Sequence, residues 1–91
     1  MSGDVNKAEL DNKIDSVAND LSNKFEVTPS LIRFALALLI SEIMDAGFNE
    51  EKAVDSAIKS VYDWAGKPIP PREILISNNK RIFFSLLKPR E

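Results

Sequence analysis

The residues of this chain that could do chemistry are its carboxylates and a group of cations near its C-terminal end. The sequence has 91 residues and contains no cysteine and no histidine. Their absence removes thiol nucleophiles, thiolate metal sites and the commonest general base at neutral pH. The three glycines are isolated, so there is no Gly-rich phosphate loop. Four carboxylates share one predicted helix at positions typical of a solvated face: Glu50, Glu51, Asp55 and Asp63. We therefore expect no enzyme activity, no metal and no cofactor.

The cations are concentrated in the last quarter of the chain. Residues 1–66 carry six Lys and Arg against twelve Asp and Glu, a net charge of −6, whereas residues 67–91 carry six against two, a net charge of +4. An acidic body with a basic end indicates a binding partner. The predicted contact residues for a protein or nucleic acid are Lys80, Arg81, Phe83, Lys88 and Arg90. The cations suit phosphate or carboxylate groups, and an exposed aromatic residue beside an arginine suits an interface.

A central helix over residues 29–46 organises the other predicted elements. Thr28 can cap its N-terminus through the side chain, Pro29 fits the first helical position, and Gly47 can close the C-terminus in a left-handed conformation. The helix is apolar over most of its circumference, which predicts that other elements cover it on several sides. On this interpretation Leu38 is a core residue, and Thr28 contributes a stabilising cap.

Two more helices are predicted on either side of the central one. The apolar spacing of the first covers about residues 6–25, after a frayed segment at 1–4, and that of the third covers about residues 50–65, capped by Asn49. A stiff, proline-rich connector follows at 67–71.

The C-terminal part is predicted to form a small β-hairpin. Residues 73–77 and 81–87 are rich in β-formers around Asn78-Asn79-Lys80, and residues 88–91 form a basic tail. On this register Phe83 lies on the outer face; the alternative is that it packs against the first helix or Trp64. A second interpretation of the segment is a short fourth helix over Lys80–Leu87, which has no helix-breaking residue before Pro89. The predicted fold class is a single, mainly α domain over residues 1–91 with a small β-hairpin.

The order of helix, short extended segment, two helices and hairpin resembles that of winged-helix domains. The resemblance covers residues 6–87 and implies a hairpin tip at Asn78–Arg81 that touches nucleic acid. The third helix departs from the family because its carboxylates outnumber its lysines, which opposes insertion into a DNA groove. Winged-helix-like domains without a basic recognition helix often serve as protein-docking pieces of replication and transcription assemblies. The resemblance implies the same role here.

A shorter resemblance concerns the turn Met44-Asp45-Ala46-Gly47-Phe48. It resembles the Met-Gly-Phe loop with which ubiquitin-associated domains contact their partner, although Ala46 stands where that loop has its methionine. The turn also has a local explanation, since Gly47 is suited to a helix C-terminus.

These observations predict a non-catalytic accessory or adaptor subunit that docks onto a larger protein, such as a DNA polymerase or another nucleic-acid-processing assembly. The alternatives are weak, sequence-tolerant DNA binding through the hairpin and tail, a ubiquitin-associated-like module, and a homodimer formed through a leftover apolar face of the central helix. The apolar run at 31–40 is shorter than the roughly 20 residues that span a bilayer, and the N-terminus lacks a signal-peptide core. We therefore expect a soluble, cytoplasmic protein without membrane contact.

Overall fold

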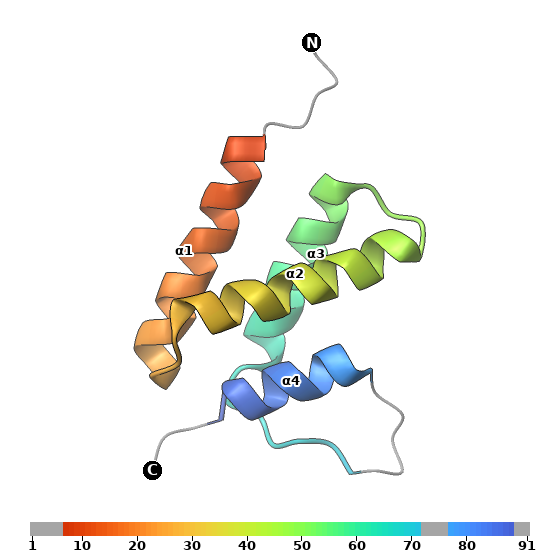
Figure 1. Cartoon of the computed structure of the whole chain (residues 1–91). Helices are drawn as coiled ribbons and strands as arrows, with labels where there is room; N and C mark the ends of the chain where they lie inside the picture. Colours follow the sequence, from red (N-terminus) through yellow and green to blue (C-terminus); the bar gives the residue numbers. More distant parts are fainter. Residues whose placement is uncertain (1–6, 72–76, 89–91) are drawn as a thin grey trace.

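The computed structural model describes residues 7–71 and 77–88, which contain four α-helices (Figure 1). The helices are α1 (Lys7–Phe25), α2 (Pro29–Asp45), α3 (Glu50–Trp64) and α4 (Asn78–Leu86). The three helices predicted at about 6–25, 29–46 and 50–65 are confirmed to within a residue or two. The frayed segment at 1–4 lies outside the described residues.

The β-hairpin prediction is wrong. No strand occurs among residues 7–71 and 77–88, and the segment assigned to the second strand lies in α4. The first strand, at 73–77, lies outside the described residues except for Ser77, whose hydroxyl oxygen caps α4 by accepting a hydrogen bond from the backbone N–H of Lys80. The resemblance to winged-helix domains, which depended on the hairpin, therefore does not describe this fold. The fourth-helix interpretation is the one that the structure confirms.

The apolar spacing of α4 explains why it is a helix despite its β-forming residues. Phe83, Phe84 and Leu87 are buried, and Lys80 precedes them on the same helical face at the spacing i, i+3, i+4, i+7. This face packs on the other helices, and the packing overrides the weak intrinsic preferences of isoleucine and phenylalanine.

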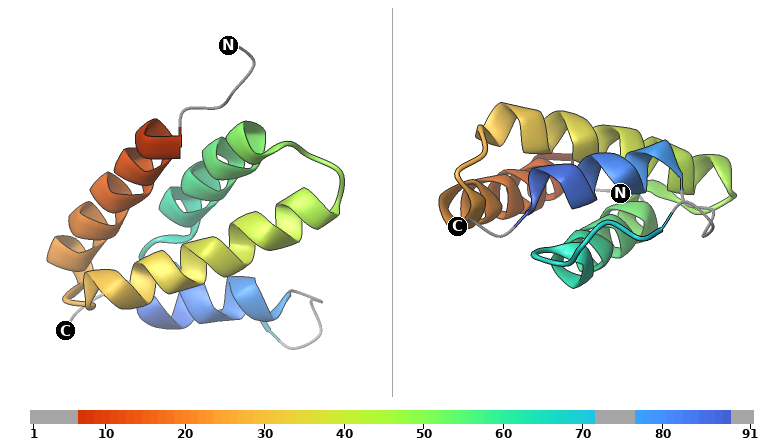
Figure 2. Two further views of the ribbon diagram at one scale, coloured as in Figure 1. Left: turned by 45° about the horizontal axis from the view of Figure 1, so that its top comes forward. Right: turned by 90° about the horizontal axis from the view of Figure 1, so that it is seen from below.

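The arrangement places α2 at the centre. In Figure 2, α1 and α3 lie side by side, α2 crosses both, and α4 runs alongside α2. One face of α2 is buried among the other three helices, and its buried residues are Ile32, Ala35, Leu36, Leu39 and Ile40. We call this set the inner face of α2. The predicted central position of this helix is confirmed.

The two ends of α2 differ from each other in how well the sequence predicts them. Pro29 occupies the first turn as expected, but the Thr28 side chain makes no capping hydrogen bond. The backbone carbonyl of Thr28 instead accepts the first hydrogen bonds of the helix, from the N–H groups of Leu31 at 3.0 Å and Ile32 at 3.3 Å. At the other end Gly47 has φ of 111°, in the left-handed region, as its predicted role requires.

Helix α3 begins with the predicted cap, and a second glycine, Gly66, follows two residues after its end. The Asn49 side-chain oxygen accepts from the backbone N–H of Lys52 at 2.8 Å. After α3, Gly66 adopts φ of 78° and its N–H donates to the carbonyl of Leu87 at 2.8 Å. This hydrogen bond ties the start of the proline-rich connector to the end of α4.

Candidate protein-binding face

The predicted contact residues do not form one surface. Phe83 is 0% exposed, and its ring centroid lies 6.0 Å from that of Trp64. It is a core residue rather than an exposed anchor, which agrees with the alternative that placed it against Trp64. Lys80 is partly buried, with its ammonium 5.7 Å from the centroid of the Trp64 ring. Arg90 lies outside the described residues.

Of the remaining predicted cations, Arg81 lies in α4 and is partly buried, whereas Lys88 comes two residues after the end of α4 and is exposed. Arg81 shares one side of α4 with two exposed polar residues, Asn78 and Ser85, at spacings of three and four residues. Residues 77–88 contain no carboxylate. This polar, positively charged surface is small, and it is all that remains of the predicted contact surface within the described residues.

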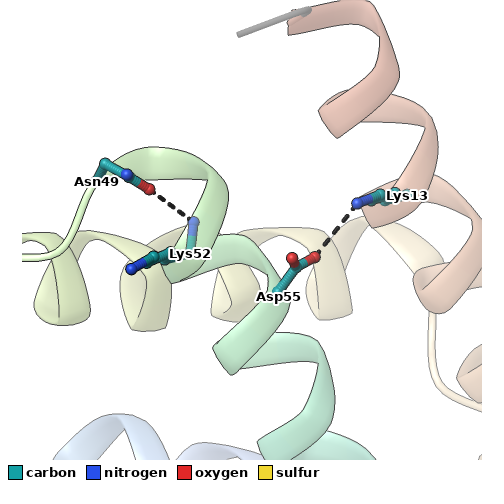
Figure 3. A network of polar contacts seen from close by, with 4 residues as sticks. All are labelled: Lys13, Asn49, Lys52 and Asp55. Carbon is teal, nitrogen blue, oxygen red and sulfur yellow. Dashed lines mark hydrogen bonds and ion pairs between the residues drawn. The ribbon is translucent and has the colours of Figure 1, made fainter.

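Carboxylates of α3 form ion pairs with lysines on the surface and do not converge on a cleft. Asp55 lies 3.2 Å from the ammonium of Lys13, a contact between α3 and α1 that Figure 3 shows beside the Asn49 cap. Asp63 pairs with Lys67 at 3.4 Å within the same stretch of chain. Such exposed pairs each contribute at most about 1 kcal/mol. Among the described residues no group of three or more His, Cys, Asp or Glu side chains is placed to hold a metal ion.

One further polar contact joins α1 to α3. The Tyr62 hydroxyl donates to Asp20 at 2.7 Å, and Lys24 lies 3.5 Å from the same carboxylate oxygen. Partial burial and the hydrogen bond to Asp20 raise the pKa of Tyr62 to about 12. The hydrogen bond from Tyr62 is the main cause that lowers the pKa of Asp20; desolvation opposes it, and the nearby Lys24 adds to the lowering. Tyr62 therefore stays protonated at neutral pH and acts as a hydrogen-bond donor, not as a base or nucleophile.

An exposed apolar surface lies on α2, opposite its inner face. Leu31, Phe34 and Leu38 recur at spacings of three and four, and their exposed fractions are 46%, 63% and 36%. We call these three residues the outer stripe. The prediction that Leu38 belongs to the core is therefore wrong. The sequence predicts that α2 is an apolar helix. Which side of α2 stays exposed to solvent depends on where the other three helices pack.

The outer stripe is bordered by α1 on one side and α4 on the other. Toward α1, the guanidinium of Arg33 lies 3.6 Å from Asp15. Toward α4, the side-chain amide of Asn79 donates at 3.2 Å both to the carbonyl of Leu38 and to the carboxylate of Glu42. The buried inner face holds α2 against the other helices and these contacts add to it, so the stripe is presented on a packed helix.

A concave surface lies between α2, α3 and the start of α4. It is an open groove of about 430 Å³ in which apolar walls from Leu39, Ile43 and Trp64 meet Ser60 and Lys80. Met44 and Phe48, from the turn that resembles a ubiquitin-associated loop, are 40% and 54% exposed. That resemblance remains a prediction.

Comparison with known proteins identifies no relative: no family model, curated protein or solved structure matches this chain. Within residues 7–71 and 77–88, none of the helices has the length and apolar composition needed to cross a membrane.

Proposed function

We propose that this protein is a non-catalytic adaptor that docks onto a larger protein through the outer stripe of α2. The observation that supports the proposal is the exposure of three large apolar side chains, with Phe34 at the centre, along one side of a single helix. Scattered exposed apolar residues are normal in proteins, but an apolar patch along one element is typical of an interaction site. Aromatic anchors flanked by aliphatic residues carry much of the binding energy in such sites.

The placement of the stripe favours binding without rearrangement. The inner face of α2 is buried, and Arg33 and Asn79 hold the helix to its neighbours on both sides. A partner would therefore meet a preformed helical surface, which lowers the entropic cost of association.

The test compares two phenylalanines with similar exposure. Phe34 lies in the outer stripe, and Phe48 lies in the turn between α2 and α3. We expect proteins recovered with the tagged wild type from native lysate to be lost with Phe34→Ser and retained with Phe48→Ser, while circular dichroism shows that both variants are folded. Recovery that depends on Phe48 alone would contradict the proposal and favour the ubiquitin-associated interpretation. Recovery that depends on neither residue would also contradict it.

The cations near the end of the chain support a second candidate function, weak and sequence-tolerant binding of nucleic acid. Its basis is the pair of cations formed by the partly buried Arg81 and the exposed Lys88, in a segment, residues 77–88, that contains no carboxylate. Each phosphate contact of this kind on duplex DNA contributes about −0.9 to the slope of log affinity against log salt.

Fluorescence anisotropy with labelled single- and double-stranded DNA at two salt concentrations tests this second function. We expect the double variant Arg81→Ala/Lys88→Ala to lose binding at low salt. The matched variant Lys52→Ala/Lys59→Ala removes the same charge from α3 and should bind as wild type does. Absence of binding by the wild type at low salt, or equal losses in the two variants, would refute a nucleic-acid contact on α4.

A further inference from the structure

Beyond the outer stripe, the same side of α2 carries carboxylates that form no ion pair with a cation of residues 7–71 and 77–88. Along the same side of α2, Leu38 is followed by Ser41, Glu42 and Asp45 at the spacing i+3, i+4, i+7. Glu42 accepts a hydrogen bond from the neutral amide of Asn79, and Asp45 forms no ion pair with any described residue. This side of α2 is therefore apolar along the outer stripe and anionic toward its C-terminal end.

The position of these carboxylates on the helix makes them unfavourable for the isolated domain. The C-terminal end of a helix carries a partial negative charge, so cations stabilise it and anions do not. The last turn of α2 contains no basic residue. The only cation of α2, Arg33, is directed toward Asp15 of α1. A positive charge brought by another molecule would supply what this end of α2 lacks.

A second copy of this chain that paired through the same side of α2 would not supply that charge. In an antiparallel pair centred on Leu38, Asp45 would face Leu31 of the other copy. Glu42 would then face Phe34 of the other copy, so both carboxylates would be desolvated against apolar side chains. In a parallel pair each carboxylate would face its own equivalent, and like charges would repel. The stripe is not self-complementary.

We propose that the partner segment bound by the outer stripe is a basic amphipathic helix. Its apolar side chains pack on Leu31, Phe34 and Leu38, and its Lys or Arg residues lie against Glu42 and Asp45. From Leu31 to Asp45 this side of α2 is about 21 Å long at 1.5 Å per residue, so a partner helix of about 15 residues covers it. Packing of an amphipathic helix by its apolar side is a common mode of peptide recognition. This inference rests on the proposed function and specifies the chemistry of the partner.

Two labelled helical peptides of about 16 residues provide the test. Both carry leucines at the spacing i, i+3, i+7, and they differ only in having lysines or glutamates at the charged positions beyond the leucines. We expect the lysine peptide to bind the full-length protein at least about tenfold more tightly than the glutamate peptide, because like charges at an interface are strongly disfavoured. Added NaCl should weaken binding of the lysine peptide. Equal binding of the two peptides would overturn the inference.

Variants of the protein locate the site. Phe34→Ser should abolish binding of the lysine peptide, and Glu42→Gln/Asp45→Asn should weaken it about tenfold, the loss of two exposed ion pairs. The control Asp11→Asn/Asp63→Asn removes the same charge from α1 and α3 and should leave affinity unchanged. Similar losses in the two charge variants would show attraction to the overall acidic protein and would overturn the inference.

The outcomes separate this inference from the proposed function. If Phe34→Ser abolishes recovery of cellular partners but neither peptide binds, the adaptor proposal stands and the basic-helix inference fails. If Phe34→Ser changes no recovery, the adaptor proposal itself fails. Light scattering that shows a dimer converted to a monomer by Phe34→Ser would replace the basic helix with a second copy and overturn the inference.

Discussion

Leu36 and Leu38 are identical residues two positions apart on α2, yet Leu36 is fully buried whereas Leu38 is 36% exposed. The inner face of α2 packs against three helices, and the outer face, which is also rich in apolar residues, is left largely open to solvent. The difference shows that hydrophobicity along a helix predicts burial only where a neighbouring element covers that side. It also divides α2 into one side that stabilises the domain and another side that is available for binding.

The largest change in stability that we predict concerns α4, which packs against the inner face of α2. Phe83→Ala removes a fully buried ring that packs against Trp64, and it should lower the free energy of unfolding by roughly 3–5 kcal/mol. Urea denaturation followed by circular dichroism measures this change. A cost below about 1 kcal/mol would mean that α4 is not part of the core and that Phe83 is surface-accessible, as the hairpin register implied.

The second prediction concerns the inner face itself. Leu36→Ala should cost roughly 2–5 kcal/mol because it leaves a cavity between packed helices. Leu38→Ala, the matched change on the outer side, should cost clearly less because the side chain is already partly in water. Equal costs, measured by the same urea denaturation, would abolish the distinction between the two faces of α2.

The sequence predicts those features of the fold that depend on neighbouring residues in the chain. The limits of α1, α2 and α3, the Asn49 cap and the left-handed Gly47 follow from spacing and turn residues, and all are present. The hairpin error arose at residues 80–87, where β-forming composition was given more weight than helical periodicity. The spacing of Lys80, Phe83 and Leu87 was a usable signal for α4 that the prediction did not follow.

The candidate site was harder to predict for a different physical reason. Phe34 is one of many apolar residues in α2, and nothing in its local sequence distinguishes it from Leu36. Its exposure depends on where α1, α3 and α4 dock, which is a property of the whole fold. The difference in net charge between residues 1–66 and 67–91 led instead to a predicted contact surface at the C-terminal end. There Phe83 is buried and Lys80 packs on the ring of Trp64.

A third prediction compares the starts of two helices. Asn49→Ala removes the side chain that caps α3 and should cost about 1 kcal/mol. Thr28→Ala should change stability by less than about 0.5 kcal/mol, because the Thr28 side chain makes no capping hydrogen bond and α2 is held by its inner face. Thermal denaturation of the two variants provides the measurement. A larger loss for Thr28→Ala would mean that α2 depends on its cap more than on its packing.

The smallest effect on stability is predicted for the residue with the largest predicted effect on binding. Phe34→Ser exchanges a side chain that is 63% exposed for a small polar one, so the free energy of unfolding should change by no more than about 0.5 kcal/mol. Apolar surface that does not stabilise the domain and remains exposed to water is better explained by a partner than by the fold. If Phe34→Ser instead destabilised the protein as much as Leu36→Ala, Phe34 would be a packing residue of the isolated chain. The outer stripe would then no longer be a surface available for docking.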